Sequence, residues 1–167
     1  MNTFEELQDE ACKDGIEVIE NYPFTSDRIE GLYVDSTIAL SKGLTTCAEK
    51  SCVLAEELGH HYTASGDIIN QSNAENRKQE LRGRIWAYNK QIGLTGLVNA
   101  YRSHCQNAHE VAEYLGVTDE FLADSLDYYR SKYGCCVQID NFVIFFEPNI
   151  AVTVSYTHLT LPTTRRV

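Results

Sequence analysis

One short segment of the chain carries residues that could bind a divalent metal ion and activate water. Its string is Glu56-Glu57-Leu58-Gly59-His60. In a helix, residues four apart lie one turn apart on the same face, so Glu56 and His60 can reach one ion. The zincin motif is His-Glu-x-x-His, and here a glutamate stands at the first ligand position. Because carboxylate oxygen is an acceptable zinc ligand, the spacing predicts a metal site held by Glu56 and His60.

The remaining parts of such a site are a general base and a third ligand. Glu57 is expected to project beside the ion, where a carboxylate can take a proton from a metal-bound water. Glu80 is the candidate third ligand, because it shares a helix face with Gly83 and Ala87, whose small size lets two helices approach closely. A carboxylate at position 56 shifts the preference modestly from zinc toward harder ions, such as manganese or another divalent metal.

The same string has a plainer interpretation, a solvated acidic helix with ordinary Glu–His pairs, since short motifs also occur by chance. His61 is interpreted as a surface or packing residue, with Glu57 as an alternative partner. Tyr62 could donate a hydrogen bond near the metal, but packing is its favoured role. Arg82 or Arg84 could orient a ligand carboxylate.

The elements that must position these residues are mainly helices with recognisable ends. We expect helices over residues 3–14, 46–64, 72–92, 107–115 and 118–133. The last four each begin with a Thr, Ser or Asn whose side chain can accept a hydrogen bond from a first-turn amide. Glycines at positions 66, 93, 116 and 134 are expected to follow their last residues.

Strand patterns lie at the two ends of the chain. Alternation over 16–19, with an apolar segment over 31–40 that turns at Asp35-Ser36, predicts a small antiparallel sheet. Residues 137–139 and 142–146 flank Asp140-Asn141, which predicts a hairpin. Strands, then helices, then a hairpin indicate an α+β fold in a single domain over residues 1–153.

The last segment, residues 154–167, differs from the rest of the chain. It is rich in threonine, contains no acid, and is similar to a translated sequencing adapter. We therefore expect it to be a non-native tail, in which His158 has no role. The alternative is a true C-terminal strand, since Tyr, Thr and Leu suit strands.

The charge and the hydrophobic pattern limit which partners and which cellular location are expected for this protein. The formal net charge is -10 and the longest apolar run is Phe142–Phe146, which predicts neither a nucleic-acid binder nor a membrane protein. Residues 107–133 could form a helix-turn-helix, but its second helix is acidic and would repel phosphate. The N-terminus has no pattern of a secretory signal, so the expected location is the cytoplasm.

Two paired motifs resemble a known family. The segment 49–63, followed by 76–82 and Trp86-Ala87-Tyr88, is similar to the ImmA/IrrE family of zinc metallopeptidase-like proteins, particularly the small members carried by prophages and integrative elements. The resemblance runs from about Gly15 to Pro148. It implies a zincin-like fold and an acidic third ligand on the following helix, which falls on Glu80. The chain departs from the family at Glu56, where most members have histidine.

The resemblance also implies a role in releasing genes from a helix-turn-helix repressor. The leading hypothesis is a zinc-dependent endopeptidase that cuts this repressor, with the substrate extended along an edge strand of the N-terminal sheet. The alternative is a non-catalytic, metal-binding anti-repressor that binds the repressor without cutting it. A DNA-binding accessory factor is the third interpretation, and the acidic composition disfavours it.

Overall fold

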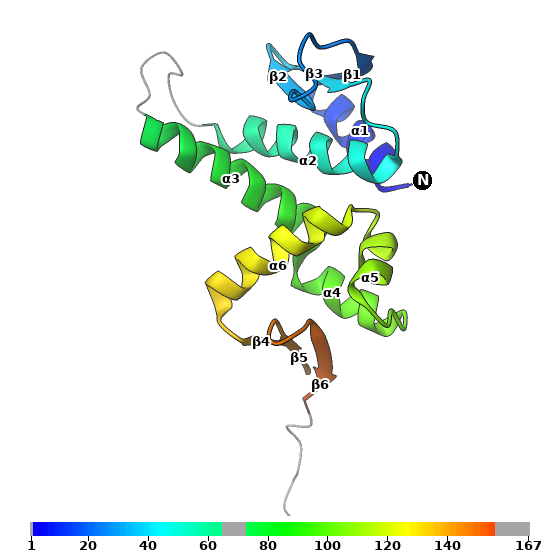
Figure 1. Cartoon of the computed structure of the whole chain (residues 1–167), viewed down its shortest axis with the longest axis vertical. Helices are drawn as coiled ribbons and strands as arrows, with labels where there is room; N and C mark the ends of the chain where they lie inside the picture. Colours follow the sequence, from blue (N-terminus) through cyan, green and yellow to red (C-terminus); the bar gives the residue numbers. More distant parts are fainter. Residues whose placement is uncertain (1, 65–72, 156–167) are drawn as a thin grey trace, which may run out of the picture.

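The structure, a computed structural model, describes residues 2–64 and 73–155. Helices and two three-stranded sheets follow one another along the chain, so the α+β prediction is confirmed (Figure 1). The elements are α1 (Thr3–Lys13), β1 (Glu17–Tyr22), β2 (Gly31–Val34), β3 (Thr37–Ser41), α2 (Cys47–Thr63), α3 (Asn73–Gln91), α4 (Gly93–Arg102), α5 (Ala108–Leu115), α6 (Asp119–Tyr133), β4 (Cys136–Ile139), β5 (Phe142–Phe145) and β6 (Ala151–Val154). None of the helices in the described ranges is long and apolar enough to cross a membrane.

The N-terminal sheet has the strand order β1-β3-β2. β2 and β3 form the predicted hairpin, and its turn residues Asp35 and Ser36 have φ values of 47° and 60°. This left-handed backbone is typical of the tight turns that join antiparallel strands. β1, however, pairs with β3 in parallel, so the prediction of a wholly antiparallel sheet is wrong. Alternation in β1 determines which of its faces is buried, but it carries no information about the direction of the neighbouring strand.

Helices α1 and α2 cover the inner face of this sheet. The buried face of α1 consists of Phe4, Leu7 and Ala11, as its amphipathic pattern predicts. Ile38 on β3 and Leu58 on α2 are fully buried in the same core. Figure 1 shows the sheet above α1 and α2, with α3 and α6 on the other side of α2. α2 is therefore held from both sides, which keeps the orientation of its side chains well defined.

The helix ends follow the predicted signals where the structure describes them. Thr46 and Glu49 form a reciprocal capping box at the start of α2. Asn107 caps α5, and Thr118 caps α6 through the amide of Phe121. The signals predicted at 66 and 72 lie outside the described residues.

Helix α4 was not predicted by the sequence patterns. Gly93 was expected to follow the last residue of a helix, but its φ of +58° forms a bend from which α4 starts directly. No side chain caps the start of this helix, so the usual signal for a helix start is absent. The helix also contains a second glycine, Gly96, which lowers its intrinsic tendency to form. Its buried residues Leu97, Val98 and Ala100 show that tertiary packing stabilises it.

The C-terminal sheet begins with the predicted hairpin. β4 and β5 pair in antiparallel around Asp140-Asn141, and Asp140 has a φ of 50°. β6 adds a third antiparallel strand and includes Val154, the first residue of the predicted non-native tail. The sheet packs against α4 and α6. Residues 156–167 of that predicted tail lie outside the described residues.

Candidate metal centre

A glycine-to-glycine contact determines how closely α2 and α3 approach. A Cβ atom on Gly59 would lie 2.2 Å from the carbonyl oxygen of Gly83, and a Cβ atom on Gly83 would lie 2.6 Å from Nδ1 of His60. Both distances are too short for a side chain. Ala87, one turn further along α3, is fully buried. The prediction that small residues on this face of α3 allow close helix packing is confirmed.

The close approach brings Glu80 of α3 to His60 of α2. The Oε2 atom of Glu80 lies 3.3 Å from Nε2 of His60. The other carboxylate oxygen of Glu80 lies 3.2 Å from Nε of Arg84. One carboxylate thus joins the two helices, and the expectation that an arginine of α3 orients it is met by Arg84. The chain brings together two of the three predicted metal ligands, at positions 60 and 80.

Glu56 faces a cleft of about 570 Å³ on the α6 side of α2. The carboxyl groups lining this cleft are those of Asp27, Glu30, Glu49, Glu56, Glu120 and Asp124. Among the lining residues that the structure describes, Arg84 is the one basic side chain. Burial raises the pKa of Glu56 to about 7, with the charges of Glu80, Glu30 and Asp124 adding to the rise and Arg84 opposing it.

Glu57 faces strand β2 rather than the cleft. Burial is the main cause that raises the pKa of Glu57 to about 7, and the charges of Glu56 and Glu80 raise it further. The backbone N–H of Tyr33 donates a hydrogen bond to the Glu57 carboxylate, which opposes the rise. The predicted general base therefore has an orienting partner and a pKa near neutrality.

Two residues of β2 that position Glu57 were missed by the sequence analysis. A Cβ atom on Gly31 would lie 2.9 Å from Oε1 of Glu57 and 2.6 Å from Cγ1 of Val53. Glycine at this position lets the strand lie against α2, and Tyr33 two residues later supplies the amide. A glycine inside a strand often marks such an approach, so Gly31 was the signal available.

The neighbouring aromatic residues have structural partners. Nδ1 of His61 lies 2.7 Å from the hydroxyl oxygen of Tyr33, so His61 contacts β2 instead of Glu57. The ring of Tyr62 packs against Trp86 with centroids 4.9 Å apart, and its hydroxyl donates to Asp14. The favoured packing role of Tyr62 is confirmed, and His61 strengthens the contact between β2 and α2.

The acidic residues of the site point to different partners. Within residues 2–64 and 73–155, no three His, Cys, Asp or Glu side chains lie close enough together to hold a metal ion. Glu56 faces the cleft, Glu57 faces β2, and Glu80 contacts His60. The donor types and the excess of negative charge nevertheless fit a divalent cation, since imidazole and carboxylate are common zinc ligands.

The raised pKa values predict how stability depends on pH. Between about pH 4.5 and 7, Glu56 keeps its proton in the folded state while the unfolded chain loses it. The free energy of unfolding therefore falls as pH rises through this window. Glu56→Gln should raise the free energy of unfolding by about 1–3 kcal/mol at pH 8 and leave it unchanged at pH 4. Urea denaturation with a chelator present measures this effect.

The matched control for this experiment is Glu113→Gln, on the surface of α5. The Glu113 side chain is 69% exposed, so its replacement should change stability little at either pH. An equal gain from Glu56→Gln at pH 4 and pH 8 would contradict the ionisation account.

Comparisons with known proteins leave the chain without an assigned relative. No family model, curated protein or solved structure gives a significant match. The chemistry of the site must therefore be inferred from its own residues.

Proposed function

We propose that this protein is a zinc-dependent endopeptidase of the ImmA/IrrE type, with a zincin-like fold. Its substrate is a helix-turn-helix repressor of a prophage or mobile element, in the cytoplasm. The observation that carries the proposal is the contact of Glu80 with His60 through the Gly59–Gly83 approach, beside Glu56 and Glu57. The contact supports the proposal because His60 and Glu80 are donor types that bind cations, and Glu57 is the proposed general base on the same helix as His60.

Glu56, His60 and Glu80 would hold the metal. Glu56 lies one helical turn from His60, and Glu80 is already in contact with that histidine. Burial is the main cause of the raised pKa values of Glu56 and Glu57, and the charge of Glu80 raises both further, so a cation would relieve this smaller repulsion. When bound, zinc would supply Lewis-acid chemistry that polarises a scissile carbonyl and lowers the pKa of water. Manganese is the alternative.

Glu57 is the residue proposed to take the proton from water. A general base works best when its pKa lies near the operating pH, and the pKa of Glu57 is about 7. The backbone N–H of Tyr33 favours the ionised form of this carboxylate. β2 is an edge strand, because the sheet order is β1-β3-β2, so an extended substrate segment can lie along it next to Glu57.

The charge of the adjacent cleft supports a basic substrate. Its described lining residues include six carboxyl groups and one arginine, which favours Lys- and Arg-rich segments. Repressors contact DNA phosphates through such residues.

The test is incubation of the purified protein with the repressor encoded beside it, with zinc added in one sample and a chelator in the other. We expect repressor fragments with zinc, identified by mass spectrometry, and intact repressor with the chelator. An intact repressor in both samples contradicts the endopeptidase assignment.

The second candidate function is a metal-binding anti-repressor that does not cut. Glu56 at the usual histidine position favours it, as does the ion pair of Arg84 with the proposed ligand Glu80. This function predicts a stable complex of the two intact proteins in size-exclusion chromatography. Zinc-dependent fragments exclude it.

A further inference from the structure

The outer face of the N-terminal sheet is apolar and faces solvent. Val18 and Ile38 point inward to the core, so the alternate residues point outward. We call this surface the apolar sheet face, and it consists of Ile19, Tyr22, Phe24, Leu32, Val34 and Ala39. Leu32 is 48% exposed and Val34 is 51% exposed. A cluster of this kind on one surface is typical of an interaction site.

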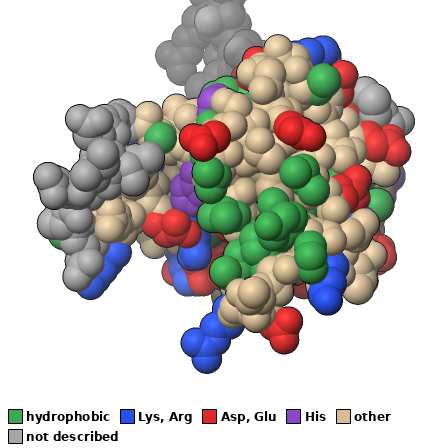
Figure 2. Space-filling model, turned by 90° about the horizontal axis from the view of Figure 1, so that it is seen from above, with side chains coloured by type: hydrophobic (Ala, Val, Ile, Leu, Met, Phe, Trp, Pro, Cys, Tyr) green, Lys and Arg blue, Asp and Glu red, His purple; other side chains and the backbone are tan. Residues whose placement is uncertain are grey.

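The apolar sheet face has the dimensions of a helix-binding surface. Ile19, Ala39 and Leu32 lie opposite one another across the three strands. Strands lie about 4.8 Å apart, so this row is roughly 10 Å wide, which is close to the diameter of a helix. The surface is hollowed into a groove of about 360 Å³. Figure 2, viewed from this side of the molecule, shows the hydrophobic side chains gathered together.

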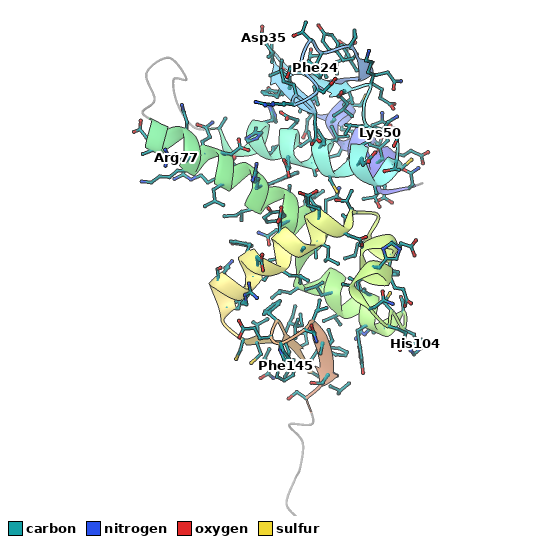
Figure 3. The ribbon with its side chains drawn as sticks, viewed as in Figure 1. Phe24, Asp35, Lys50, Arg77, His104 and Phe145 are labelled. Carbon is teal, nitrogen blue, oxygen red and sulfur yellow. The ribbon has the colours of Figure 1, made fainter. Side chains whose placement is uncertain are left out.

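Acidic residues border the apolar sheet face. Glu17 lies in the outward row with Thr37 and Val34, and Asp35 directly follows β2. Both acids are exposed. Figure 3 shows Asp35 at the outer end of the sheet, and Figure 2 shows acidic side chains on several sides of the hydrophobic cluster, with basic ones also at its edge. Lys and Arg on a partner would complement this border.

We infer that the apolar sheet face docks an amphipathic helix whose apolar stripe is flanked by Lys and Arg. The inference rests on the proposed function in one respect: the helix belongs to the DNA-binding repressor. A second copy of this chain fits poorly, because a symmetric pair would bring the same acidic borders together with a charge of -10 on each protomer. An anionic membrane would be repelled in the same way.

The location of the docking surface connects it to the proposed metal centre. β2 presents Leu32 and Val34 on its outer face, and the amide of Tyr33 between them binds Glu57. A partner seated on the apolar sheet face therefore lies against the strand that orients the proposed base. Docking on the face does not use the edge of β2 that faces away from β3, so a second, extended segment of the same partner can lie there.

The experiment measures binding of the full-length repressor in a Glu57→Gln background, which prevents cutting. Leu32→Ser/Val34→Ser removes two exposed apolar side chains from the sheet face. We expect the Kd to rise at least about tenfold, measured by calorimetry. The matched control is Tyr114→Ser on α5, where a tyrosine 49% exposed is also removed, and its Kd should stay unchanged. Hydrogen exchange on the parent protein should show that the repressor protects residues 17–41.

The possible results distinguish a failure of the docking inference from a failure of the endopeptidase proposal. If the double variant with Glu57 intact cuts the repressor at the parent rate, the docking inference is wrong and the endopeptidase remains. If the double variant loses binding while the zinc-loaded parent leaves the repressor intact, the docking inference stands and the endopeptidase fails. Absence of repressor binding by the parent overturns the docking inference, as does protection confined to regions outside 17–41.

Discussion

Glu57→Gln is expected to reduce the rate of repressor cleavage by about 10²–10⁴-fold, the usual contribution of a general base. Glutamine keeps the size of the side chain and can still accept the hydrogen bond from the Tyr33 amide, but it cannot take a proton. The zinc content and the Kd for the repressor should therefore stay close to those of the parent. Single-turnover assays with zinc-loaded protein measure the rate.

The cleavage rate of Glu57→Gln also tests which of two glutamates is the general base, because the pKa values of Glu56 and Glu57 are both raised to about 7. Glu56 faces the acidic cleft, whereas Glu57 is oriented by β2, so the geometry favours Glu57 as the base. Cleavage within tenfold of the parent rate in Glu57→Gln would remove that role. Glu113→Gln, an exposed glutamate on α5, is the control and should cut normally.

Glu80→Ala is expected to weaken zinc binding by about a hundredfold. Structural zinc sites bind with about 10–16 kcal/mol shared among four ligands, so one ligand is worth roughly 3 kcal/mol. Cleavage at limiting zinc should fall in parallel. Competition with a chromogenic chelator measures the affinity, and unfolding experiments verify that the variant is folded.

The control for Glu80→Ala is Glu113→Gln. Glu113 is an exposed glutamate on α5, outside the proposed site, so zinc affinity should stay unchanged when its charge is removed. Equal zinc affinity in the parent and in Glu80→Ala would show that the metal is held elsewhere.

The local features of the fold and of the site could be predicted from the sequence. The capping box at Thr46 depends on residues three positions apart, and the turns at Asp35-Ser36 and Asp140-Asn141 depend on adjacent ones. The contact of Glu80 with His60 was also accessible, because one helical face carries Glu80, Gly83 and Ala87.

Features that depend on distant partners could not be predicted in this way. The parallel pairing of β1 with β3 is determined by how the chain crosses the sheet, which no alternation pattern encodes. α4 is stabilised by its buried face and has no side-chain cap. The hydrogen bond from the Tyr33 amide to Glu57 joins residues on different elements, and a backbone donor leaves no trace in residue type.

The contact between Gly59 and Gly83 limits how this protein can change over time. In most helix pairs, enlarging one residue can be offset by shrinking its neighbour. Here both positions already have the smallest residue, and a Cβ atom on either would meet the backbone of α3 or the ring of His60. No compensating substitution exists within the pair, so we expect neither position to accept a larger residue while α2 and α3 keep this close approach.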